Sequence, residues 1–102
     1  MKFQTIGNPN DSLIIMLPGS FWPSSGLNYL YEKLKDDYCI VLVEYNGHYE
    51  NSTFSSRQNE AKGIVEYIQK QNIHTIKMIY GQSMGAEIAI ELFKQLEKTN
   101  ID

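Results

Sequence analysis

The sequence predicts an α/β fold in which a mainly parallel four-stranded sheet has helices on both faces. Two runs of consecutive apolar residues have the pattern of strands buried on both faces. Apolar stripes at helical spacing separate the strands and follow the last one. Strands that alternate with helices in this way form parallel sheets with right-handed crossovers. The 102 residues, 42% of them hydrophobic, are expected to form one domain over residues 1–102.

Four segments are expected to form the strands. They are Lys2–Ile6 and residues 12–17, 39–45 and 75–80. The first is followed by turn-favouring residues at 7–11, and the second ends at Pro18 and Gly19. Cys39, at the start of the third, is expected to be a buried small hydrophobe.

Three helices are expected, over about residues 25–36, over about 57–71, and after the segment 81–85 to about Lys98. Ser55 and Gln58 have capping-box spacing at the start of the second helix. In the third helix the residues expected to face the core are Ala86, Ala89, Ile90, Phe93 and Leu96. Ile88 and Leu92 are expected off that face and exposed.

Composition and charge argue against several functional classes. Nine Lys and Arg against twelve Asp and Glu give a net charge of −3, with no basic cluster for nucleic acid. The longest apolar run, Leu13–Leu17, is far too short to span a membrane, and no signal-peptide pattern opens the chain. A single cysteine excludes an intrachain disulfide and a multi-cysteine zinc site. We therefore expect a cytoplasmic protein without metal or cofactor.

The motif Gly81-Gln82-Ser83-Met84-Gly85 carries the strongest chemical signal. It is a G-x-S-x-G at a predicted strand-to-helix junction, the context of a nucleophile elbow. In such a turn Ser83 presents its hydroxyl, and side chains at 81 and 85 would collide with neighbouring backbone. The Met84 amide, at the positive end of the helix dipole, would stabilise an oxyanion. The alternative is a turn in which Ser83 merely caps the helix.

From these residues the chain resembles the α/β-hydrolase family over most of its length. In that family the turn after an early strand supplies a second oxyanion-hole amide, and residues 17–23 occupy its place. The resemblance assigns that donor to the amide of Ser20, while Pro18 stands where histidine is common. Phe21 and Trp22 would line the acyl pocket or anchor the loop, and Tyr45 is a further expected substrate contact.

The loop over residues 44–52 is similar to a glycine-rich loop of the family. Glu44, Gly47 and Ser52 fit the pattern, whereas Tyr49 replaces its second glycine. His48 lies where that loop often has a structural histidine. It is also an alternative catalytic base, because it follows a strand at the same sheet edge as Ser83.

The serine lacks triad partners in this sequence. The family's order is Ser, then Asp or Glu, then His, and no histidine follows Ser83. We therefore expect a truncated, amino-terminal part of the fold, inactive alone, from an esterase, thioesterase or lipase acting on acyl esters or thioesters. One alternative is a subunit completed by a second chain that carries Asp and His. The other is a non-catalytic binding or interaction domain that keeps the turn as architecture.

The family's strand order implies how the chain associates. It places residues 12–17 between 39–45 and 75–80, with Lys2–Ile6 outside 39–45. The strand from Thr75 to Tyr80 would then be an edge, and such edges recruit another strand. We therefore expect a homo-oligomer through this edge, or pairing with a complementary carboxy-terminal half.

Overall fold

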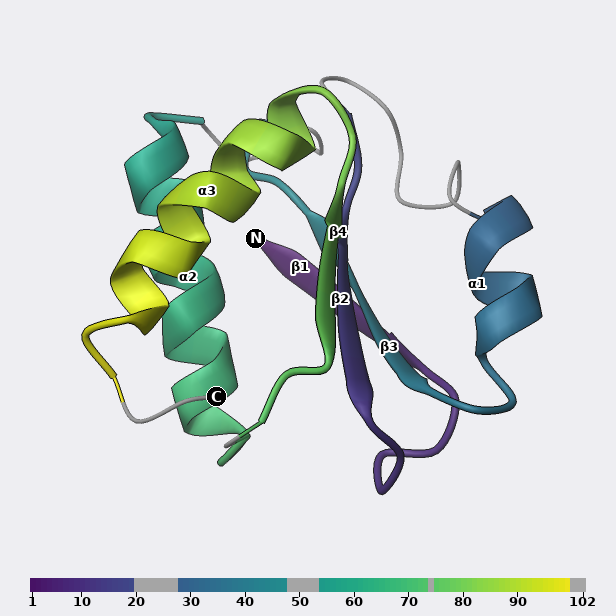
Figure 1. Ribbon diagram of the computed structural model, residues 1–102. Coiled ribbons are helices and arrows are strands. Elements are labelled where there is room, and N and C mark those ends of the chain that lie inside the picture. The colour runs from purple at the N-terminus through teal and green to yellow at the C-terminus, as the bar shows by residue number, and fades with distance from the viewer. Residues whose placement is uncertain (20–27, 48–53, 74, 100–102) are drawn as a thin grey trace.

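The computed structural model describes residues 1–19, 28–47, 54–73 and 75–99. Its four strands form one sheet in the order β1-β3-β2-β4 (Figure 1). Their bounds are Lys2–Ile6 for β1, Leu13–Leu17 for β2, Cys39–Glu44 for β3 and Met78–Gly81 for β4. The expected strand order is thus confirmed, with β4 at one edge. The expected bounds of this strand, residues 75–80, were wrong at its start, because β4 begins only at Met78.

The sheet is mixed. β2 pairs in parallel with both β3 and β4, whereas β1 runs antiparallel to β3 and forms the other edge. Because β2, β3 and β4 are parallel, their carboxyl ends meet at one edge of the sheet. Leu17 and Gly81 are partners there, and Glu44 ends β3 at the same edge. This is the edge at which open α/β sheets bind ligands.

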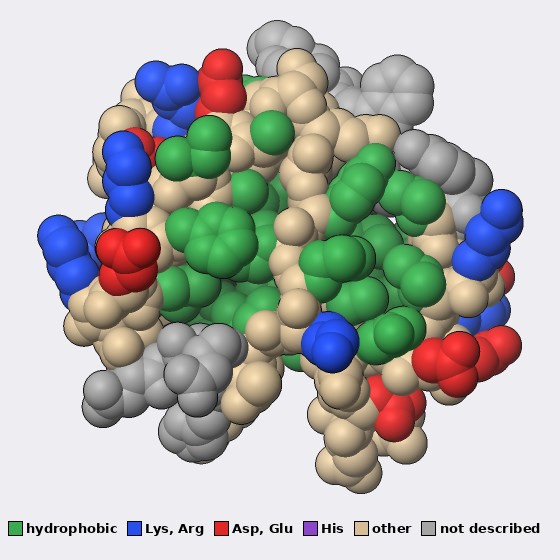
Figure 2. Space-filling view, viewed as in Figure 1, with side chains coloured by type: hydrophobic (Ala, Val, Ile, Leu, Met, Phe, Trp, Pro, Cys, Tyr) green, Lys and Arg blue, Asp and Glu red, His purple; other side chains and the backbone are tan. Residues whose placement is uncertain are grey.

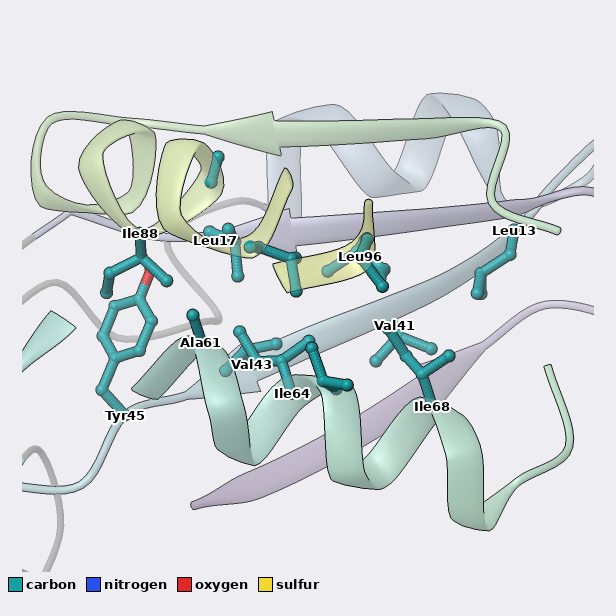
Figure 3. Packing of buried hydrophobic residues seen from close by; sticks show 14 of the residues in the cluster. Leu13, Leu17, Val41, Val43, Tyr45, Ala61, Ile64, Ile68, Ile88 and Leu96 are labelled. Carbon is teal, nitrogen blue, oxygen red and sulfur yellow. The ribbon is translucent and has the colours of Figure 1, made fainter. Parts of the chain in front are cut away.

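Helices cover both faces of the sheet, as expected. α2 (Arg57–Lys70) and α3 (Met84–Leu96) lie side by side on one face, and α1 (Asn28–Leu34) lies on the other (Figure 1). The larger core cluster lies between the sheet and α2 and α3, where Leu17, Val43, Ile64 and Ile88 meet (Figure 3). Cys39 belongs to this cluster, and burial raises the pKa of its thiol. Its expected role as a buried hydrophobe is confirmed.

The face that α3 turns to the core differs from the expected one. Ile88 and Leu92, expected to be exposed, are fully buried. Ile90 and Phe93, expected in the core, are 57% and 55% exposed, and Ala86 is exposed as well. The buried positions of this helix are Gly85, Ile88, Ala89, Leu92 and Leu96. Because most of α3 is apolar, packing against α2 and the sheet decides its orientation.

The start of α2 also differs from the predicted capping box. The N-cap is Ser56, whose Oγ accepts a hydrogen bond from the Asn59 N–H at 3.1 Å. Ser55 instead accepts a bond from the Asn59 side-chain amide at 2.7 Å. Serine is a favoured N-cap residue, so either of the two adjacent serines could cap the helix. The path of the chain into α2 places Ser56 at the N-cap position. None of the helices in the described residues is long and apolar enough to cross a membrane.

Candidate functional site

The turn between β4 and α3 holds Ser83 in an unusual backbone conformation. Its φ is +52° and its ψ is −115°, a combination that L-residues rarely adopt. Backbone of this kind costs about 1–3 kcal/mol and persists where surrounding structure enforces it. Ser83 lies two residues beyond Gly81, the last residue of β4, and is exposed. The strained, projecting serine expected from the motif is therefore observed.

The two glycines of the motif make this turn possible. A Cβ on Gly81 would lie 2.6 Å from the backbone of Gly85. A Cβ on Gly85 would overlap the carbonyl oxygen of Leu17 and lie 2.7 Å from that of Pro18. Glycine thus lets the first turn of α3 pack directly on the end of β2. The collisions expected at positions 81 and 85 are confirmed.

Hydrogen bonds fix the turn without using the serine hydroxyl. The Gln82 N–H donates to the Leu17 carbonyl at 3.1 Å, and the Gly85 N–H donates to the Gln82 carbonyl at 2.7 Å. The Ser83 carbonyl accepts from the Ala86 N–H at 2.9 Å, whereas its side chain makes no capping bond. Met84 opens α3, where backbone N–H groups have no carbonyl one turn behind them within the helix.

Tyr45 ties the end of β3 to the segment that follows β2. Its ring is completely buried beside Ile88 (Figure 3), and its hydroxyl donates to the Pro18 carbonyl at 2.8 Å. Burial raises the pKa of Tyr45, and the nearby Glu60 carboxylate raises it further, so the hydroxyl stays a donor. The Pro18 carbonyl also packs on Gly85, next to the Leu17 carbonyl. Tyr45 therefore touches the backbone that supports the elbow.

The buried carboxylate of Glu60 binds Asn46, the residue that follows Tyr45. Glu60, on α2, is 1% exposed. Its two oxygens accept from the Asn46 backbone N–H at 2.7 Å and from the Asn46 side-chain amide at 2.9 Å. The Met1 amino group donates to Asn46 Oδ1 at 2.5 Å. The sequence carried a signal for Glu60, which lies one turn before Ile64 on the buried stripe of α2.

Comparison with known proteins supports the architecture. No family model and no curated protein matches the chain. Among solved structures, an α/β-hydrolase family protein from Desulfitobacterium hafniense superposes with a TM-score of 0.85 at 24% identity. A marine microorganism esterase gives 0.81 at 23%, and 1H-3-hydroxy-4-oxoquinoline 2,4-dioxygenase gives 0.80 at 22%. The chain has the α/β-hydrolase fold.

The match covers most of this chain and a minor part of each of those proteins. The superpositions span 89%, 94% and 92% of this chain and 38%, 37% and 36% of the respective matched chains. At these identities the likeness establishes the fold alone. The dioxygenase among the matches is named for a reaction other than hydrolysis, so the fold does not determine the chemistry.

Within the α/β-hydrolase fold, the structure brings Ser83, Met84, Tyr45 and the end of β2 to one sheet edge. Ser20, Phe21, Trp22 and His48 lie outside the described residues. Among the residues that are described, no group of three or more His, Cys, Asp or Glu side chains could hold a metal ion.

Proposed function

We propose that this chain carries the nucleophile of a serine hydrolase of the esterase, thioesterase or lipase type. The observation that carries the proposal is Ser83 at φ +52°, exposed and not capping the helix that it precedes. A serine that only terminated the strand or capped α3 would not require this strain. The substrate class would be a small acyl ester or thioester.

In the proposed reaction Ser83 Oγ attacks the acyl carbonyl carbon, and the alcohol or thiol leaves as the acyl-serine forms. The negative charge on the carbonyl oxygen is held by the Met84 amide, with the Ser20 amide as the second donor. A base must take the serine proton and pass it to the leaving alcohol or thiol. Water, deprotonated by the same base, then attacks the acyl-serine, which releases the carboxylic acid and restores the Ser83 hydroxyl. Because no histidine follows Ser83 in this sequence, we assign the base to a histidine on a further segment or chain, with His48 as the alternative.

Tyr45 enters the proposal as a positioning residue. With no exposed side-chain surface, it is a poor candidate for the expected substrate contact. Its hydroxyl instead holds the Pro18 carbonyl, two residues before Ser20, against the turn that bears Ser83. Catalytic hydrogen-bond donors act best when they are held in place before the reaction.

Chemical rescue tests the proposal. The chain alone should turn over nitrophenyl acetate negligibly, because a triad without its base retains only the modest effects of binding and the oxyanion hole. Added imidazole can stand in for the missing base, so it should accelerate acetylation of Ser83, followed as an adduct by peptide mass spectrometry. Ser83→Ala should abolish the adduct. Ser12→Ala, which removes an exposed serine beyond the opposite edge, should not affect it.

Two outcomes would redirect the assignment. Equal acetylation of Ser83 and Ser12 at every imidazole concentration would favour the non-catalytic alternative, in which the turn is architecture. Full esterase turnover by the chain alone, abolished by Ser83→Ala and by His48→Ala, would make His48 the base.

A further inference from the structure

Asn46 and Gly47 form an Asn-Gly pair just beyond the end of β3, and it is the one such pair in the sequence. Gly47 has a φ of +87°, a conformation that L side chains rarely adopt. A Cβ at this position would also lie 2.9 Å from the Cβ of Phe54. The path of the backbone therefore requires glycine after Asn46.

An asparagine followed by glycine is a chemically labile pair. The backbone nitrogen of the glycine attacks Cγ of the asparagine, and the side-chain amide leaves as ammonia with the proton of that nitrogen. Water then opens the resulting succinimide at either carbonyl, which gives aspartate or isoaspartate. Asparagine is among the thermolabile residues, and glycine has no side chain to shield its nitrogen from this attack.

The contact with Glu60 holds the Asn46 side chain away from that attack. One Glu60 oxygen accepts from the Asn46 backbone N–H at 2.7 Å, and the other accepts from Asn46 Nδ2 at 2.9 Å. Because one carboxylate takes both bonds, Nδ2 lies on the same side of Cα as the N–H of its own residue. The attacking nitrogen of Gly47 lies on the other side. Attack therefore requires the side-chain bond to Glu60 to break.

Glu60 in turn requires the side-chain amide of Asn46. The Asp and Glu side chains in view in Figure 2 lie around the periphery of the molecule, whereas Glu60 is 1% exposed. A buried carboxylate is costly unless hydrogen-bond donors surround it, and Asn46 supplies two. Backbone geometry thus requires Gly47 and the buried carboxylate requires Asn46, so the labile pair follows from the structure.

We propose that Asn46 is a deamidation site, that opening of its contact with Glu60 limits the reaction, and that the product disrupts this contact. Deamidation puts an oxygen where Nδ2 now lies 2.9 Å from the Glu60 carboxylate, so two like charges would meet beside buried structure. The Met1 amino group, which donates to Asn46 Oδ1, would still meet one oxygen of the new carboxylate. An isoaspartate would also lengthen the backbone next to Tyr45.

Peptide mass spectrometry of the aged protein tests the site and its protection. In urea Asn46 should convert faster than Asn59, which precedes a glutamate. In the native protein its conversion should be slower by about tenfold or more, because only open molecules react. Glu60→Gln, at a temperature where circular dichroism shows a folded chain, should accelerate it about tenfold. Glu66→Gln, at an exposed position of the same helix, is the matched control and should leave the rate unchanged.

Thermal melting tests the effect of the product. Asn46→Asp should melt below the wild type, because its carboxylate faces that of Glu60. The double variant Asn46→Asp with Glu60→Gln should melt above Asn46→Asp, because amide and carboxylate have then exchanged places and can again bind each other.

Equal conversion of Asn46 in the native protein and in urea would overturn the proposal. So would a wild-type rate in folded Glu60→Gln, faster conversion of Asn59 than of Asn46 in urea, or a double variant that melts no higher than Asn46→Asp. These outcomes are independent of Ser83, so failure here leaves the proposed chemistry standing.

Discussion

Replacing Tyr45 with phenylalanine isolates one hydrogen bond at the base of the candidate site. The change keeps the buried ring and removes the hydroxyl that donates to the Pro18 carbonyl at 2.8 Å. A buried carbonyl left without its donor costs about 1–3 kcal/mol. For a domain near this size, each kcal/mol lowers the melting temperature by about 4–8 °C. We therefore expect Tyr45→Phe to melt at least 4 °C below the wild type in circular dichroism.

The same variant should change the response to alkaline pH. Burial, and then Glu60, raise the pKa of Tyr45 in the folded state above its ordinary value near 10. The folded chain therefore holds this proton more tightly than the unfolded chain. The resulting stability is fully present below pH 10 and is lost above it, at up to about 1.4 kcal/mol per pH unit. Tyr45→Phe should lack this loss, so its melting temperature should approach that of the wild type above pH 10.

Tyr67→Phe is the matched control, because the Tyr67 ring stacks on Phe3, with centroids 3.9 Å apart, and would keep that contact. We expect this variant to melt close to the wild type at neutral pH. Tyr45→Phe should also slow imidazole-assisted acetylation of Ser83 about tenfold at a temperature where both proteins are folded. Equal melting of the two variants, with the same alkaline profile and acetylation rate, would refute the reasoning.

Three further substitutions test the packing of the site. Gly85→Ala should cost about 3 kcal/mol in urea unfolding, because its Cβ would overlap backbone at the end of β2. Ser83→Gly should stabilise the fold by about 1 kcal/mol relative to Ser83→Ala, since only glycine relieves the positive φ; equal stabilities would show that the turn is unstrained. Glu60→Gln should cost about 1–3 kcal/mol by thermal melting, because an amide cannot accept both Asn46 bonds; an unchanged melting temperature would contradict this.

The central strands were predictable because their apolar runs are continuous. Only a strand with both faces buried requires consecutive apolar residues instead of alternating apolar and polar ones. β2 is such a strand, because it is buried at every position. The orientation of α3 was not predictable in the same way. Its sequence has apolar residues around most of the helix, so the sequence alone does not show whether Ile88 or Ile90 faces the core. In the structure, packing against α2 buries Ile88 and leaves Ile90 exposed.

The elbow was predictable because its requirements are local. A tight turn needs glycine where backbone approaches backbone, and the motif supplies it at positions 81 and 85. The Tyr45 contact was not predictable, because it joins residues 27 positions apart and depends on which strand ends adjoin at the sheet edge. Glu60 could have been found, since a carboxylate on a buried helical stripe needs hydrogen-bond donors nearby.

The most direct test of the central claim is labelling with a fluorophosphonate, which reacts with activated serines. The whole protein, with whatever segment or partner supplies the base, should carry one phosphonyl group per chain on the peptide containing Ser83. Ser83→Ala should remove the label, while Ser12→Ala should retain it. A label on another serine, or none on Ser83 in a protein that hydrolyses esters, would contradict the assignment of Ser83 as nucleophile.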